Sequence, residues 1–196
     1  DRRSLGVGDD GVVLISAMRS VMYNQREFWK HIDRVLGDNK NAYYIALGID
    51  KLPYEIKHAD RVILPGFVDD VINWMSASDI YIDPFPIGSG SSILEAIHAG
   101  LPAIGFDDTM DTLFHPRQVS LMRPYVGDSD GIIKFGDLTA WKAFVDKAIV
   151  SKDLRLRLSK ENKLRLDGLT LKKETNRFFD TIVECYNKKM DRRGFQ

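Results

Sequence analysis

Short apolar segments recur through the first half of the chain. The first is Val12-Val13-Leu14-Ile15, which is apolar at every position instead of alternating with polar residues. Strands with this pattern are typical of a parallel sheet whose two faces are both covered by helices. Four further segments of the same kind follow. We therefore predict strands over residues 12–15, 42–47, 62–64, 80–82 and 101–106.

Between these strands, apolar residues recur at the spacing of a helix, so helices are predicted there. Phe28, Ile32 and Leu36 fall on one face of a helix over 26–36 that Gly37 ends. Asp69 is expected to cap the next helix, which runs through Ser76. A short strand is predicted over 131–135. The remaining helices are expected over 91–99, from 137 onward, over 153–166 and over 171–189.

The alternation of strands and helices defines the fold class. It predicts an α/β fold, a Rossmann-like parallel sheet with helices on both faces, followed by C-terminal helices. Residues 1–11 are polar and glycine-rich and are expected to form a linker, residues 12–190 one domain, and residues 191–196 a tail. Because the chain begins with Asp1 instead of Met, we expect that it was cut from a longer protein. Ligands of such folds bind at the carboxyl ends of the strands.

Composition narrows the class of protein. The 196 residues carry no formal net charge, so we expect no nucleic-acid partner. No apolar run approaches the roughly 18 residues that span a bilayer, and we expect no signal peptide because no basic segment followed by an apolar stretch begins the sequence. The single cysteine, Cys185, excludes an internal disulfide or a cysteine zinc cluster. No His/Asp/Glu set has metal-ligand spacing, so no metal site is expected, and a cytoplasmic location fits these features.

The C-terminal part of the chain is basic. From Ser151 onward it contains 13 Lys and Arg against 7 Asp and Glu. A solvated helical face is the simplest explanation of this excess. The alternative is a weak peripheral contact with an anionic membrane surface.

A loop with almost no side-chain bulk follows the fourth predicted strand. It consists of Gly88, Ser89, Gly90, Ser91 and Ser92, and it leads into a helix. Unpaired backbone amides and the helix dipole favour an anion at such a place. Glycine lets a ligand approach the backbone, and the serines would add hydroxyl donors. The 88–92 loop is therefore predicted to hold a diphosphate, and the alternative is an ordinary turn with a serine cap.

Glu95 lies in the first turn of the helix that follows this loop. Its carboxylate offers two acceptors in one plane, which suits the two hydroxyl groups of a ribose. The segment Ser92-Ile-Leu-Glu95 also has the form of a capping box, in which Glu95 would bond the backbone at the start of the helix. Both interpretations stay open at this stage.

Three residues after other strands complete the candidate site. Arg19 follows the first strand, and arginine suits bidentate contacts with phosphate; the alternative is a surface arginine. Gly66 and Phe67 follow the third strand, where an aromatic side chain could line the pocket of a base. The alternative for Phe67 is packing in the core.

These motifs together resemble the C-terminal, donor-binding half of a GT-B glycosyltransferase. The resemblance covers residues 12–186 and depends on two segments. The first is Ser-Asp-Ile-Tyr-Ile-Asp-Pro-Phe-Pro before the loop, and the second is Leu-Glu-Ala-Ile-His-Ala-Gly-Leu-Pro-Ala-Ile after it. The resemblance implies that Glu95 holds the ribose, that the 88–92 loop and Arg19 hold the diphosphate, and that Gly66 and Phe67 border the base.

The same resemblance implies how the enzyme would work. The retaining branch of the family has a Glu-x7-Glu pattern; Glu95 matches the second position and Ile87 stands at the first. The Asp-Pro-Phe-Pro-x-Gly start is similar to bacterial protein glucosyltransferases and their O-GlcNAc transferase relatives, which are inverting. The catalytic base is expected on a missing N-terminal domain, so this chain alone would be inactive.

The resemblance also implies which ligands such an enzyme would bind. The donor would be a UDP-sugar, with no further cofactor, and the acceptor a sugar, a lipid or a protein. A nucleotide-sugar epimerase of the same fold and a non-catalytic α/β interaction domain are the alternatives.

Overall fold

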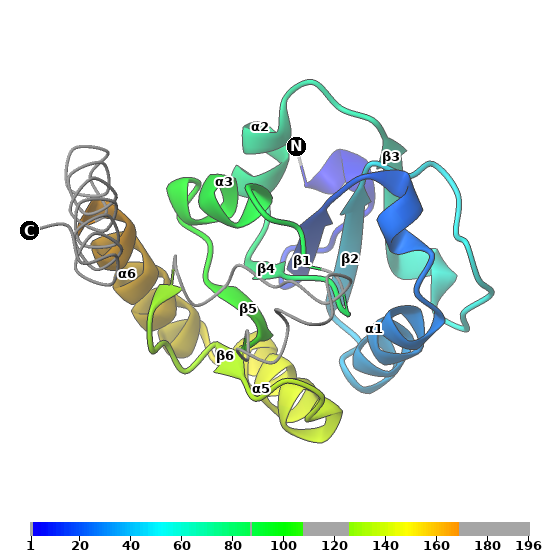
Figure 1. Cartoon of the computed structure of the whole chain (residues 1–196). Helices are drawn as coiled ribbons and strands as arrows, with labels where there is room; N and C mark the ends of the chain where they lie inside the picture. Colours follow the sequence, from blue (N-terminus) through cyan, green and yellow to red (C-terminus); the bar gives the residue numbers. More distant parts are fainter. Residues whose placement is uncertain (1, 87, 108–125, 169–196) are drawn as a thin grey trace, which may run out of the picture.

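The computed structural model describes residues 2–86, 88–107 and 126–168 of the chain. Its centre is a six-stranded, all-parallel sheet with the strand order β3-β2-β1-β4-β5-β6 (Figure 1). The order reverses between β1 and β4, which is the switch point where ligands of open α/β sheets bind. The strands are β1 (Val12–Ala17), β2 (Ala42–Leu47), β3 (Val62–Gly66), β4 (Ile80–Ile82), β5 (Ala103–Phe106) and β6 (Ile132–Ile133).

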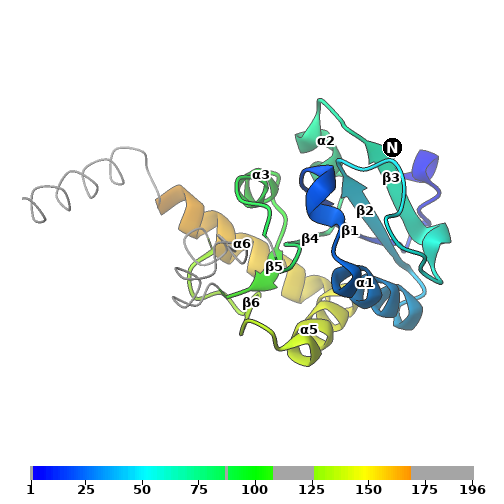
Figure 2. The same cartoon turned by 45° about the vertical axis from the view of Figure 1, so that its right-hand side comes forward.

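Helices cover both faces of this sheet (Figure 2). α1 and α5 pack on one face and α2 and α3 on the other, whereas α6 packs beside the β5 end of the sheet. The predicted α/β, Rossmann-like fold is therefore confirmed. The helix expected over 171–189, the tail and Cys185 lie outside the described residues. The helices are α1 (Arg26–Asp38), α2 (Val71–Ser76), α3 (Ser92–His98), α5 (Leu138–Val150) and α6 (Lys152–Gly168).

Successive residues of β1 supply both halves of the core. Leu14 packs in the cluster that contains Trp29 and Trp141, on the α1 and α5 face. Ile15 packs in the cluster that contains Ile93, on the α2 and α3 face. Side chains alternate between the two faces of a strand, so burial on both faces requires the continuous apolar pattern seen in the sequence.

Several local predictions differ from the structure. α1 runs through Gly37 to Asp38, so the prediction that Gly37 ends this helix was wrong. β1 continues to Ala17, and β5 begins at Ala103.

The N-cap of α2 is Asp70, whose carboxylate accepts a hydrogen bond of 3.1 Å from the Asn73 amide, so the prediction of Asp69 was wrong. β3 runs to Gly66 instead of ending at residue 64. It stays paired with β2 because the Gly66 amide donates to the Ile49 carbonyl at 2.9 Å, and its own carbonyl accepts from Gly48 at 2.8 Å.

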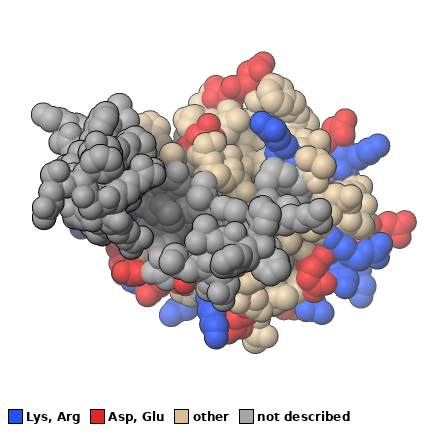
Figure 3. All heavy atoms as spheres, viewed as in Figure 1, with Lys and Arg blue, Asp and Glu red and all other residues tan. Residues whose placement is uncertain are grey.

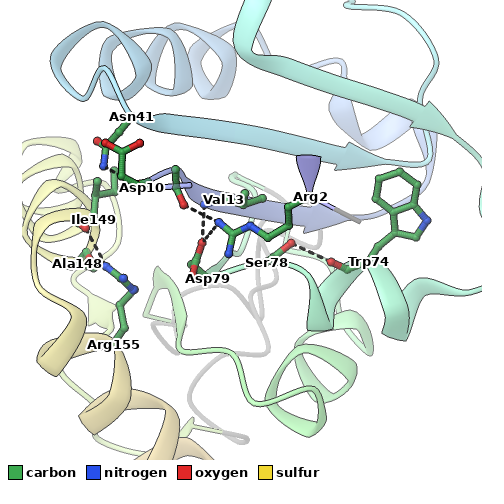
Figure 4. Close-up of polar contacts among 11 residues, drawn as sticks. Arg2, Asp10, Val13, Asn41, Trp74, Ser78, Asp79, Ala148, Ile149 and Arg155 are labelled. Atoms are coloured by element: carbon green, nitrogen blue, oxygen red, sulfur yellow. Dashed lines mark hydrogen bonds and ion pairs between the residues drawn. The ribbon is translucent and has the colours of Figure 1, made fainter. Parts of the chain in front are cut away.

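The segment that was expected to be a linker packs against the domain. Arg2 donates to the Gly11 carbonyl at 2.5 Å and to the Asp79 carboxylate at 2.7 Å (Figure 4). The same carboxylate oxygen accepts a hydrogen bond of 2.8 Å from the Val13 amide. Val7 is buried in the core cluster on the α2 and α3 face. Polar contacts thus tie this segment to the amino ends of β1 and β4.

Charged residues are mixed on the described surface. On the face shown in Figure 3, Lys and Arg alternate with Asp and Glu. In α6, Arg157 pairs with Asp130 at 2.7 Å and with Glu161 at 3.0 Å. Lys163 pairs with Asp167 at 2.7 Å, so part of the positive charge of this helix is balanced locally. A membrane contact through the C-terminal part stays a prediction.

Candidate functional site

A cavity of about 640 Å³ lies at the carboxyl ends of the central strands. The ends of β1 and β2 form its floor through Ala17 and Leu47. Its walls come from the turn after β1, from the residues after β3, and from the 88–92 loop and α3. The cavity therefore occupies the place that the strand order predicts for a ligand.

The turn after β1 forms one wall with Met18, Arg19 and Ser20. Arg19 is exposed, and within the described residues its guanidinium has no hydrogen-bond or ion-pair partner. Its five N–H donors remain available to an anion in the cavity. The cation predicted at the carboxyl edge of the sheet is present there.

Tyr23 packs beneath the turn after β1 and contacts the carboxyl ends of β1 and β2. Its ring is fully buried, and its hydroxyl lies 3.0 Å from the carbonyls of both Ser16 and Leu47. Burial raises the pKa of Tyr23 well above its usual value, and the neighbouring Tyr44 and Tyr81 add to the shift. The phenol therefore stays neutral and keeps its proton for these carbonyls, which links the ends of β1 and β2.

Gly48 brings the turn after β1 against the end of β2. Its φ of +104° lies in the left-handed region, and a Cβ atom there would meet the Met18 carbonyl oxygen at 2.1 Å. Only glycine fits this contact. Sequence analysis missed Gly48, although a glycine directly after a predicted strand was the available signal.

Phe67 stands at the mouth of the cavity. Its side chain is 87% exposed, so the alternative of core packing was wrong. Gly66 does not line the first cavity. It lines a second one of about 460 Å³, which shares Ser20, Gly48 and Phe67 with the first. Phe67 thus lies at the boundary between two adjoining cavities, and Gly66 lines the second.

The 88–92 loop divides its polar groups between the protein and the cavity. Ser89 donates from its amide and from its hydroxyl to Asp83 Oδ1, at 2.9 and 2.7 Å, and its hydroxyl also contacts the Tyr81 hydroxyl. Ser89 also lines the cavity, but its hydroxyl proton is directed to Asp83, so its role as a hydroxyl donor to a ligand stays a prediction. Ser91 and Ser92 line the cavity as predicted.

The backbone of this loop keeps unused donors. The amides of Gly90, Ser91 and Ser92 have no acceptor among the described residues. Gly90 adopts a φ of +65°, which favours glycine. Gly88 is buried; neither Gly88 nor Gly90 lines the cavity. Ile87, at the first position of the Glu-x7-Glu pattern, lies outside the described residues.

Glu95 lines the cavity from the first turn of α3. The N-cap residue is Ser91, with no side-chain capping hydrogen bond, so the capping box between Ser92 and Glu95 is absent and that alternative was wrong. Among the described residues, the Glu95 carboxylate has no hydrogen-bond or ion-pair partner. It therefore faces the cavity as an unused acceptor.

The structure thus brings a cation, a carboxylate, an aromatic ring and unpaired amides to one cavity. Within residues 2–86, 88–107 and 126–168, no group of three or more His, Cys, Asp or Glu residues is arranged to hold a metal ion. A cavity that combines these groups is equipped for an anionic, hydroxylated and partly planar ligand.

Comparison of the sequence with models of known families identifies the family of this chain. The family model described as "Glycosyl transferases group 1" matches residues 9–122, which contain every residue of the cavity. This chain belongs to the family of group 1 glycosyl transferases. No curated protein sequence matches the chain.

Solved structures of similar fold are GT-B glycosyltransferases. The O-GlcNAc transferase of Thermobaculum terrenum, a K341M mutant, matches with a TM-score of 0.70 and 12% identity over 92% of this chain and 36% of its own. The pneumococcal O-GlcNAc transferase GtfA, solved with UDP and GlcNAc, matches with a TM-score of 0.61 and 19% identity over 90% of this chain and 37% of its own. At these identities the likeness shows the fold.

This group 1 glycosyl transferase chain corresponds to one part of those enzymes. It spans 46% of the WaaG glycosyltransferase and 35% of S. aureus TarM. It spans 89% of the C-terminal domain of LpcC, a group 1 protein from Francisella tularensis, with a TM-score of 0.63 and 16% identity over 85% of this chain. The predicted correspondence with a C-terminal GT-B domain is confirmed. In the described part of the chain, no helix has the length and hydropathy needed to cross a membrane.

Proposed function

We propose that this domain binds the nucleoside diphosphate sugar, a UDP-sugar, that serves as donor in glycosyl transfer. The observation that carries the proposal is the single cavity at the switch point, which Arg19 and Glu95 both line without partners among the described residues. Two of the similar glycosyltransferases, TarM and GtfA, were solved in complex with UDP. Family, fold and cavity thus support the same class of ligand.

Each part of the ligand has a chemical counterpart in the cavity. The Glu95 carboxylate accepts hydrogen bonds from the two ribose hydroxyls, and Arg19 and the loop amides bind the diphosphate. Phe67 borders the base at the mouth. In this arrangement the positive partner meets the phosphates and the negative partner meets neutral hydroxyls, so no like charges are brought together.

The same groups would act in the transfer step. An acceptor hydroxyl attacks the anomeric carbon of the donor sugar, and the bond from that carbon to the diphosphate oxygen breaks. Negative charge then grows on the leaving diphosphate, where Arg19 and the loop amides stabilise it. The base that takes the acceptor's proton is expected on an N-terminal domain, which would also bind the acceptor, a sugar, a lipid or a protein. The chain alone is then a donor-binding unit without transferase activity.

Binding of a matched pair of nucleotides tests the proposal. By isothermal titration calorimetry, the chain is expected to bind UDP with a Kd between about 1 μM and 1 mM and to bind 2′-deoxy-UDP about tenfold or more weakly, because one hydrogen bond to a charged acceptor is lost. Glu95→Ala is expected to weaken UDP binding and to abolish the preference for the ribose form.

Glu55→Ala is the matched control, because Glu55 is exposed and lies away from the cavity. It is expected to bind both nucleotides as the unchanged chain does. Absence of binding to UDP, GDP, ADP and CDP by the folded chain would overturn the proposed function. A preference for UDP over deoxy-UDP that persists in Glu95→Ala would overturn the role of Glu95.

A further inference from the structure

A buried carboxylate lies directly beneath the 88–92 loop. Asp83 follows the last residue of β4 and is only 1% exposed. Tyr81 and Asp83 are two residues apart, so their side chains leave the strand toward the same face of the sheet, the face that carries α3. Ser89 contacts both of them. Tyr81 of β4 and Asp83, directly after the strand, therefore hold one residue of the loop.

The contacts of Ser89 restrict its position strongly. Asp83 Oδ1 accepts from the Ser89 amide at 2.9 Å and from its hydroxyl at 2.7 Å, and hydrogen bonds to an ionised acceptor are the stronger kind. Burial, with the nearby Asp83 charge adding, raises the pKa of Tyr81 well above its usual value, so the phenol stays neutral and can donate to Ser89 Oγ. Ser89 thus has contacts through its backbone and its side chain, to Tyr81 of β4 and to Asp83 directly after it.

The contacts of Ser89 matter because its neighbours on both sides are glycines. Gly88 precedes it and Gly90 follows it, and glycine restricts the backbone least of all residues. Without the contacts of Ser89, little in the local sequence would hold the direction of the amides of Gly90, Ser91 and Ser92. Those amides are the donors that the described protein leaves unpaired.

We propose that Asp83 is a positioning residue for the diphosphate: through Ser89 it holds the 88–92 loop in the conformation that places Ser91 and Ser92, with their unpaired amides, at the cavity. This inference depends on the proposed function, because it assumes a diphosphate ligand. Asp83 does not line the cavity; Ser89 lines it, and its hydroxyl donates to Asp83. Their effect is expected on the phosphate part of the ligand and not on the nucleoside part.

A comparison of UDP with uridine separates positioning from general stability. Ser89→Ala removes the hydroxyl contacts and is expected to weaken UDP binding about tenfold while uridine binding stays within about twofold. Ser89→Thr keeps the hydroxyl and is expected to restore UDP binding. Ser78→Ala is the matched control: the Ser78 hydroxyl also donates a hydrogen bond within the protein, to the Trp74 carbonyl at 2.9 Å, at the amino end of β4 (Figure 4). It is expected to leave both affinities unchanged.

A double-mutant cycle tests whether Asp83 acts through Ser89. Asp83→Ala is expected to weaken UDP binding selectively, and adding Ser89→Ala is expected to weaken it no further. If Asp83→Ala does not fold, as judged by circular dichroism, Tyr81→Phe replaces it, because it removes one hydroxyl at nearly constant volume.

The outcomes distinguish this inference from the proposed function. If the unchanged chain binds no nucleoside diphosphate, the proposed function fails. If it binds UDP, and Ser89→Ala binds UDP equally well, positioning through Asp83 is overturned. An equal loss of UDP and uridine binding in Ser89→Ala would also overturn it, since that result means a general disturbance of the cavity.

Discussion

The two edges of the sheet use arginine in opposite ways. At the amino edge, the guanidinium groups donate to backbone carbonyls of the protein itself (Figure 4). At the carboxyl edge, Arg19 lines the cavity and has no partner in the described part of the chain. The amino-edge contacts are Arg2 with Gly11, Arg61 with Leu36, Asn39 and Ala42, and Arg155 with Ala148 and Ile149.

This difference separates stability from binding within one small domain. A guanidinium that already donates to carbonyls contributes to folding and has little left to offer a ligand. A guanidinium without protein partners contributes little to folding and retains its donors. Substitutions at the two edges should therefore change different measurements.

The largest expected effect is the loss of Arg61. Its guanidinium donates to Leu36 at 2.6 Å, Asn39 at 2.8 Å and Ala42 at 3.1 Å, which joins the end of α1 to the start of β2. Arg61→Ala is expected to lower the free energy of unfolding by about 2–4 kcal/mol, because several carbonyls lose a charged donor. Urea denaturation measures this change. The control is Arg34→Ala, because Arg34 is an exposed arginine on α1. Its free energy of unfolding should stay within about 0.5 kcal/mol of that of the unchanged chain. Equal losses in both variants would contradict the difference between the two edges.

A smaller loss is expected at Asp79. Its carboxylate accepts from Arg2 and from the Val13 amide, so Asp79→Ala leaves a partly buried amide without its acceptor. The free energy of unfolding should fall by about 1–3 kcal/mol. Thermal melts followed by circular dichroism provide the measurement, and Asp69→Ala, at an exposed carboxylate, is the control. If Asp79→Ala lowered the affinity for UDP but not the free energy of unfolding, the contacts at the amino edge would serve binding and not stability.

Arg19 should show the reverse behaviour. Arg19→Ala is expected to change the free energy of unfolding by less than about 0.5 kcal/mol and to weaken UDP binding about tenfold, because a direct phosphate contact is lost. Calorimetry and urea denaturation of the same preparation give both numbers. Arg26→Ala serves as control: Arg26 lies over the Tyr54 ring, away from the 640 Å³ cavity. A loss of stability in Arg19→Ala without a change in UDP affinity would show that Arg19 serves stability and not binding, which would contradict the role given to the carboxyl edge.

Local patterns predicted the strands and the position of the cavity well. Continuous apolar runs indicate strands buried on both faces, and this rule located β2 and β4 to the residue. The Gly/Ser loop, Arg19 and Glu95 were found because each follows a predicted strand. Their approach to one cavity follows from the parallel order of the sheet.

The remaining features depend on partners far away in sequence. Ser89 looks like any other loop serine until the fold places Asp83 beneath it. Asp69 and Asp70 are equally good caps by residue type, and only the backbone selects Asp70. The arginines of the amino edge have no local motif either, since Arg2 reaches Asp79 across 77 positions of the chain. Contacts of this range cannot be inferred from neighbouring residues alone.

The close contact at Gly48 affects the thermodynamics of ligand capture. Because the Met18 carbonyl occupies the space that a side chain would fill, this contact within the protein restricts the backbone beneath Arg19. A ligand that recruits Arg19 then restricts only the rotamers of one side chain and does not have to order a whole turn. The conformational entropy lost on binding is correspondingly small, and more of the interaction energy is expressed as affinity.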